Sequence, residues 1–136
     1  MNILLDTCVL LDYLQGREPF FDSALNIMIG IANRDYSGFI SANSMTDLFY
    51  IIHRSTKSDI ETLKIITRLS EIVSILDTTA EDCIRAMHSQ MGDYEDAVMA
   101  ETAHREQMDY IVTRNKADYS LSRTPALTPD EFLLLH

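Results

Sequence analysis

Residues 93–119 read DYEDAVMAETAHREQMDYIVTRNKADY and indicate the class of fold. Asp93 is a favourable N-cap for a helix that we expect from Tyr94 to about Glu106, in which several alanines allow close packing. The apolar run Tyr110–Thr113 follows this helix and is typical of a buried strand. A helix that leads directly into a buried strand is the repeating unit of parallel α/β sheets.

The same alternation of short apolar runs and helical patterns extends over the rest of the chain. We expect further strands at Asn2–Leu5, Gly38–Ser41, Val73–Leu76 and Ala126–Leu127. Pro19 indicates the start of a helix from Phe20 to about Asn33, and a capping box at Ser58–Glu61 indicates the start of another. Thr79 can cap a helix from Ala80 to Gln90. The last helix begins at Thr128–Glu131, a second capping box with Pro129 at the first helical position. The sequence therefore predicts one α/β domain, residues 1–136, around a parallel sheet of four to five strands.

Composition restricts the class of protein further. The hydrophobic fraction of 46% and charged fraction of 24% are ordinary for a globular chain. Cys8 and Cys83 have no partner at metal-ligand or redox spacing, and we expect both to be buried thiols. The N-terminal stretch lacks the basic region of a signal peptide and is broken by Asp6 and Asp12, so we expect a cytoplasmic protein without a membrane segment.

Several polar residues fall where strands end and the next helices begin. They are Asp6, Asp47 in the first turn after the second strand, Asp93, Asp96, Asn115 and Asp118. The carboxyl ends of parallel strands share one edge, where ligands bind, so these side chains should converge. Two carboxylates at ~4 Å repel by roughly 4 kcal/mol, so the cluster needs a compensating cation or raised pKa values, of which a metal ion is the simpler answer. Oxygen ligands favour Mg²⁺ or Mn²⁺, and a bound ion activates water for phosphodiester hydrolysis.

Each of these acids also has an ordinary explanation. Asp93 suits a simple N-cap, Asp96 a first-turn acid, and Asp47 a third-position acid after Ser44. Asp6 is harder to explain in this way, because it ends a buried strand, where an unpartnered charge is costly. We expect the remaining polar candidates to face solvent. They are Asp12, Asp22, Asp35, Asp59, Asp82 and Asp130, together with His53, His88, His104 and His136, which lack zinc or triad spacing.

Two segments resemble the PIN-domain family. LLDTCVLLDYL is similar to the family's opening, in which the first strand ends in a metal-binding Asp followed by a hydroxyl residue, here Thr7. Residues 93–119 are similar to the stretch D-A…A…D-x-I-V-T-x-[DN]-x-x-D-[FY]. The resemblance implies a three-layer α/β/α fold and a metal-dependent endoribonuclease that leaves a 3′-hydroxyl and a 5′-phosphate. It also implies a VapC-like toxin with RNA as substrate, an antitoxin partner and a homodimer.

Carried over residue by residue, the resemblance assigns roles. Asp6, Asp47, Asp96 and Asn115 would be catalytic, Asp6, Asp47, Asp93, Asp96 and Asp118 would hold Mg²⁺ or Mn²⁺, and Thr7 and Thr113 would orient ligands. Apart from the resemblance, Arg114 and Lys116 flank Asn115, where they either reach an RNA phosphate or, as is commoner for basic residues in a loop, are simply solvated. Two positions depart from the family pattern. SANSMTDLFYII has Asp47 where a Glu is usual, and Asn115 stands where many relatives have Asp.

The net charge of −10 is unfavourable for sequence-independent binding of nucleic acid, although bound divalent ions would offset part of it locally. An inactive PIN-like module that binds RNA or a protein therefore stays an alternative. A phosphotransfer receiver or small phosphatase is a third interpretation, but the paired acids of those proteins are not reproduced around Asp6.

Overall fold

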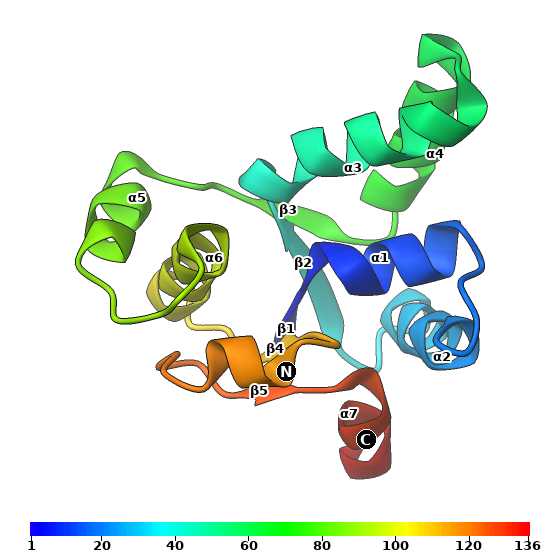
Figure 1. The fold of residues 1–136 in the computed structure, drawn as a ribbon. Coiled ribbons are helices and arrows are strands. Elements are labelled where there is room, and N and C mark those ends of the chain that lie inside the picture. The colour runs from blue at the N-terminus through cyan, green and yellow to red at the C-terminus, as the bar shows by residue number, and fades with distance from the viewer.

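The computed structural model describes all 136 residues and has a five-stranded parallel sheet at its centre (Figure 1). The strands are β1 (Asn2–Leu5), β2 (Ser37–Ser41), β3 (Ser74–Leu76), β4 (Tyr110–Val112) and β5 (Ala126–Leu127). Their order is β3-β2-β1-β4-β5, which makes β1 the central strand. All five expected strands are present, with ends within one residue of the prediction.

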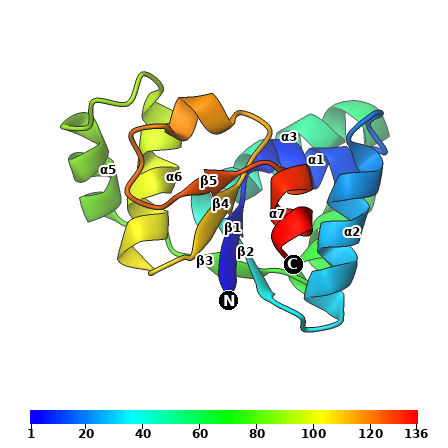
Figure 2. The ribbon, with the colours of Figure 1, turned by 90° about the horizontal axis from the view of Figure 1, so that it is seen from below.

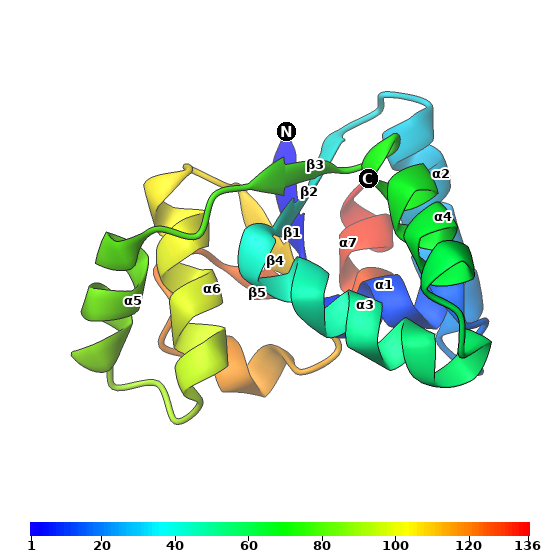
Figure 3. The same ribbon diagram turned by 90° about the horizontal axis from the view of Figure 1, so that it is seen from above.

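Helices cover both faces of this sheet, so the predicted three-layer α/β/α architecture is confirmed (Figures 1 and 2). One face carries α1 (Thr7–Leu14), α2 (Phe21–Ala32), α3 (Ala42–Thr56), α4 (Asp59–Ser70) and α7 (Pro129–Leu135), and the other carries α5 (Ala80–Met87), α6 (Tyr94–Arg105) and the short 3₁₀ helix η1 (Lys116–Tyr119). Figure 3 shows α3 and α4 as neighbours along the outer side of the first layer. No helix is long and apolar enough to cross a membrane.

The alternation of side chains along β1 supplies the core on both sides. Ile3 and Leu5 are fully buried among α1, α2, α3 and α7, whereas Leu4 is fully buried against α6 and β4. Successive side chains of a strand point to opposite faces, so the residue after Leu5 belongs to the Leu4 side. This places Asp6 at the end of the central strand, next to α6 and η1.

Four details of the helices differ from the sequence prediction. α2 begins at Phe21, so Pro19 lies before the helix, and α5 ends at Met87 rather than near Gln90. Ser41 is the N-cap of α3, which puts Asp47 in the second turn instead of the first. Ser58 accepts a hydrogen bond from the Glu61 N–H without the return bond, whereas the boxes that open α5 and α7 are complete.

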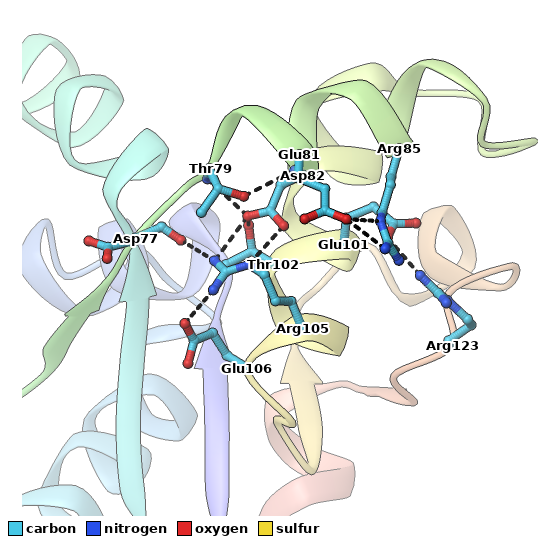
Figure 4. A network of polar contacts seen from close by, with 10 residues as sticks. All are labelled: Asp77, Thr79, Glu81, Asp82, Arg85, Glu101, Thr102, Arg105, Glu106 and Arg123. Atoms are coloured by element: carbon cyan, nitrogen blue, oxygen red, sulfur yellow. Dashed lines mark hydrogen bonds and ion pairs between the residues drawn. The ribbon is translucent and has the colours of Figure 1, made fainter.

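A buried ion pair joins α5 to α6 (Figure 4). The Asp82 side chain is 1% exposed, and its carboxylate accepts hydrogen bonds from Arg105 Nε at 2.9 Å and Nη2 at 3.0 Å. Thr102 Oγ1 and the Thr79 N–H donate to the same carboxylate at 2.9 and 3.0 Å. The prediction that Asp82 faces solvent is therefore wrong, because its partners lie on another helix. Asp22, Asp35, Asp59 and Asp130 are exposed as expected.

Candidate active site

Asp6 is the innermost of the acids at the carboxyl edge of the sheet, with 8% of its surface exposed. It is the N-cap of α1, and its Oδ1 accepts a hydrogen bond from the Thr7 N–H at 2.7 Å. Its Oδ2 accepts a hydrogen bond from Thr113 Oγ1, also at 2.7 Å, across the β1–β4 pair. Burial raises the pKa of Asp6, and these hydrogen bonds oppose the rise. The carboxylate is thus held in one orientation by neighbours that are all uncharged.

Asp96 lies in the first turn of α6 and is joined to η1 by Tyr119, whose hydroxyl donates to Asp96 Oδ1 at 3.1 Å. Burial raises the pKa of Asp96 to about 6; the Tyr119 hydrogen bond opposes the rise, and the negative charges of Asp93, Asp6 and Asp118 add to it. Charges that act on one another in this way lie close together. The structure therefore brings these four acids to one edge, as the strand ends predicted.

Asp93 also has the capping role that its position suggested. Its Oδ1 accepts a hydrogen bond from the Asp96 N–H at 2.9 Å, which satisfies one free donor at the start of α6. The bond uses only part of the oxygen lone pairs of the carboxylate. A cap and a place in the acidic cluster are therefore compatible in one residue.

Asp47 approaches the same region from α3, and it interacts with Glu95 of α6, a residue that the sequence prediction missed. Hydrogen bonding with Asp47 is the main reason why the pKa of Glu95 rises to about 7, with burial and the charges of Asp47, Asp93 and Asp96 adding to it. The two carboxyl groups face one another from α3 and α6. Glu95 stands between Asp93 and Asp96 in the first turn of a helix, and that position was the available signal.

The loop after β4 is built on Thr113, whose side chain is fully buried. Thr113 Oγ1 donates to Asp6 and accepts a hydrogen bond from the Asn115 N–H at 3.0 Å. Asn115 and Asp118 are exposed and flank the start of η1. On the other side of Asp6, the Thr7 hydroxyl is buried and has no hydrogen-bond partner. An unpaired buried hydroxyl costs ~1–3 kcal/mol, so a group that binds here could supply its partner.

Both basic candidates are already paired with acids. Arg114 Nε and Nη2 donate to Asp12 at 2.6 and 3.2 Å, and Lys116 Nζ donates to both oxygens of Glu131 at 3.0 and 3.1 Å. The Asp12 side chain is fully buried, so the prediction that it faces solvent is wrong. Arg114 is the partner that makes this burial possible.

The two cysteines differ from the prediction of buried thiols, since both are only partly buried. Cys8 Sγ lies 4.0 Å from Thr113 Oγ1, beside the acids. Burial raises the pKa of the Cys8 thiol to about 11, and the charge of Asp6 adds to the rise. The thiol therefore stays protonated at neutral pH, and its low thiolate content makes it unreactive.

The donors at this edge suit a hard divalent cation. Carboxylates, an amide oxygen and hydroxyls are the ligands that Mg²⁺ and Mn²⁺ prefer, and no histidine or thiolate set competes for a softer metal. Burial raises the pKa values of Asp6 and Asp96, neighbouring acids add to the rise at Asp96, and no basic residue opposes either shift. In the present side-chain positions no three His, Cys, Asp or Glu residues are grouped to hold one ion.

The comparisons identify the family. The family model described as PIN domain matches residues 2–117, and the chain therefore belongs to the PIN-domain family. No curated protein sequence gives a significant match.

Solved structures with the same fold cover almost the whole chain. VapBC2 from Rickettsia felis, bound to a DNA fragment from its promoter, is 19% identical over 94% of this chain and 98% of its own, with a TM-score of 0.71. VapBC-1 from nontypeable Haemophilus influenzae is 15% identical over 96% and 99%, with a TM-score of 0.68. VapC20 from Mycobacterium tuberculosis, a toxin that cleaves the sarcin-ricin loop, is 14% identical over 80% and 86%, with a TM-score of 0.61. At these identities the similarity establishes the fold.

Proposed function

We propose that this protein is an endoribonuclease that depends on Mg²⁺ or Mn²⁺ and is the toxin of a toxin–antitoxin pair. The observation that carries the proposal is the gathering of Asp6, Asp93 and Asp118 around Asp96, whose pKa their negative charges raise in addition to burial, with no basic partner to oppose them. Functional sites are where such perturbed carboxyl groups gather. The fold shared with VapC20, a toxin that cleaves the sarcin-ricin loop, supports RNA as the substrate.

In this proposal Asp6 and Asp96 are the principal ligands, because both are oriented by hydrogen bonds from neighbouring hydroxyls. Asp47, Asp93 and Asp118 would complete the site from α3, α6 and η1, with Asn115 as a neutral oxygen donor. Asp93 and Asp118 are exposed, so their side chains would have to turn inward to bind the same ion. When bound, the cation lowers the pKa of a coordinated water and offsets the charge of the phosphate.

The surrounding residues would prepare this centre rather than react. Thr113 fixes the Asp6 carboxylate through its 2.7 Å hydrogen bond, and Tyr119 fixes Asp96. Mutation of neighbours that orient ligands in this way commonly weakens metal affinity by about 10–100-fold. The unpaired Thr7 hydroxyl is free to hold a water or a phosphate oxygen beside Asp6. Glu95 would add a sixth carboxylate, and its longer side chain would compensate for the short reach of Asp47.

An antitoxin partner and a homodimer are parts of the same proposal. An apolar cavity of about 330 Å³ lies between α1, α2 and α4. Its apolar lining consists of Tyr13, Leu14, Phe21, Ile65, Leu69 and Ile72. We propose that an apolar segment of the antitoxin covers it, since two of the structures with this fold are VapBC complexes. Cytoplasmic location and dimerisation stay predictions from the sequence.

The alternative is an inactive PIN-like module that binds RNA or a protein. It is favoured by the absence of a preformed group of three metal-ligating side chains, and by the neutral Asn115. Isothermal titration with MnCl₂ separates the two functions. The nuclease requires saturable binding of Mn²⁺ together with cleavage, whereas the module requires neither.

The test of the proposed function uses purified protein, a fluorescently labelled single-stranded RNA and MnCl₂. We expect endonucleolytic products with 5′-phosphates, which EDTA abolishes. Asp6→Asn and Asp96→Asn should each reduce the rate by at least about 100-fold, because each removes an oriented ligand. Asp22→Asn is the matched control, since Asp22 is an exposed acid in the first turn of α2, and it should leave the rate unchanged. Full activity in an Asp6→Asn, Asp96→Asn double variant would rule out this site.

A further inference from the structure

Asp12 and Arg114 form the second buried ion pair of the molecule, and they are 102 residues apart in the sequence. Asp12 lies on α1, one helical turn and a half beyond Asp6. The guanidinium of Arg114 donates to both Asp12 oxygens, and it is also stacked over the Phe20 ring, 4.1 Å from the ring centroid. Three segments of the chain therefore meet at one guanidinium.

The position of Arg114 in its loop connects this pair to the acidic site. Its neighbours in sequence are Thr113, which donates to Asp6, and Asn115, whose N–H donates to Thr113 Oγ1. The Thr113–Asn115 segment follows the last residue of β4, and within it only the Thr113 N–H still bonds to a neighbouring strand, at Leu127 of β5. Without the anchor at Arg114, this segment would be held mainly by the Thr113 N–H bond to Leu127 and by the Thr113 hydroxyl itself.

The chemistry of the pair argues against a role for Arg114 in binding RNA. A guanidinium that donates twice to a buried carboxylate and covers an aromatic ring has part of its donors and one face already occupied. Moving it to a phosphate would leave Asp12 charged and buried without a partner, which is strongly unfavourable. The arrangement instead suits a rigid support.

We propose that Asp12 and Arg114 are positioning residues: their ion pair fixes the loop after β4 so that Thr113 holds the Asp6 carboxylate in the orientation that binds the divalent cation. The effect of the ion pair on cation binding rests on the proposed function, whereas its effect on the position of the loop does not. Supports of this kind behind a metal ligand affect metal affinity or activity by about 10–100-fold.

Two variants test this positioning role. Arg114→Lys keeps the charge but loses the two-pronged contact, and the Asp12→Asn, Arg114→Gln double variant removes both charges so that neither is left buried alone. Arg105→Lys is the matched control, since it makes the same change in the other buried pair. Circular dichroism and urea denaturation identify the conditions in which each protein is folded.

The first measurement is hydrogen exchange of the Asn115 amide by NMR in metal-free protein. We expect both Arg114 variants to exchange this amide at least about tenfold faster than the wild type, and Arg105→Lys to leave it unchanged. Equal exchange in all folded proteins would overturn the proposal. This readout does not depend on metal or RNA, so it decides the question even if the wild type binds no Mn²⁺, a result that would overturn the proposed function alone.

The second measurement combines titration with MnCl₂ and steady-state RNA cleavage. We expect about 10–100-fold weaker Mn²⁺ binding and a lower kcat with little change in KM in the Arg114 variants. A raised KM with unchanged Mn²⁺ affinity would mean that Arg114 contacts RNA, and it would overturn the positioning role. The same loss of Mn²⁺ affinity in Arg105→Lys would also overturn it, because the effect would then be one of general stability.

Discussion

Two regions of this protein contain buried or partly buried carboxylates whose pKa values are shifted in opposite directions. Around Asp82, between α5 and α6, burial is countered by Arg105, the Thr79 N–H and Thr102, which together lower the pKa of Asp82 (Figure 4). At the carboxyl edge of the sheet, burial and neighbouring acids raise the pKa of Asp96 to about 6. The residue type is the same, but only the first region contains its own counter-charge. Acids that the fold leaves without a partner are those available to a cation.

The largest expected effect comes from breaking the first region. Asp82→Ala leaves Arg105, Thr102 and the Thr79 N–H without their common acceptor. Removing one partner of a buried pair costs about 3–5 kcal/mol, and we expect that loss in the free energy of unfolding, measured by urea denaturation. Binding of Mn²⁺ by the folded fraction should be unchanged. If metal affinity fell in parallel with stability, the two regions would be coupled and the contrast between them would be wrong.

The pH dependence of stability sharpens the comparison. A carboxyl group whose pKa is raised in the folded state binds its proton more tightly there than in the unfolded chain. Its contribution favours folding at low pH and is lost as the pH rises through the folded pKa, which is about 6 for Asp96 and about 7 for Glu95. The Tm in EDTA should therefore fall between pH 5 and pH 7.5. The lowered pKa of Asp82 acts in the opposite direction, but only at more acidic pH.

Differential scanning calorimetry in EDTA measures this trend, with Asp96→Asn as the control. The variant should show a shallower fall, because one of the groups with a raised pKa is gone. Added Mn²⁺ should reverse the trend in the wild type, since the ion binds the ionised carboxylates. A wild-type Tm that rises steadily from pH 5 to pH 7.5 without metal would contradict the electrostatic description of the site.

The smallest expected effect concerns the contact between Phe20 and Arg114, which helps to hold the loop beside the acidic edge. Phe20→Leu keeps an apolar side chain but removes the ring over which Arg114 is stacked. Because Phe20 is 39% exposed, the interaction should contribute only about 0.5–1 kcal/mol to the free energy of unfolding. Urea denaturation measures the change. A loss as large as that of Asp82→Ala would show that the ring, and not the ion pair, holds the loop.

The strands and the acidic edge could be predicted because their signals are local. The change from an apolar run to polar residues, at Asp6 and at Thr113–Asn115, indicates where a strand ends. Because the carboxyl ends of parallel strands lie at the same edge of the sheet, these residues are expected to be neighbours. Asp12 and Asp82 were placed wrongly because their burial depends on arginines that other elements bring to them. Glu95 was missed because its significance comes from Asp47 on a different helix. Local patterns give the elements and their ends, whereas the pairing of charges requires the tertiary structure.

The central position of β1 has a consequence for the order in which the site is completed. β1 and Asp6 are synthesised before the partner strand β4, and the Thr113 hydroxyl that orients Asp6 comes more than a hundred residues after it. Chains are made from the N-terminus, and contacts between distant segments form late. For the proposed ribonuclease, the growing chain therefore has no assembled centre while β4 is still unmade. The proposed activity against RNA would therefore begin only after β4 has been made and has paired with β1.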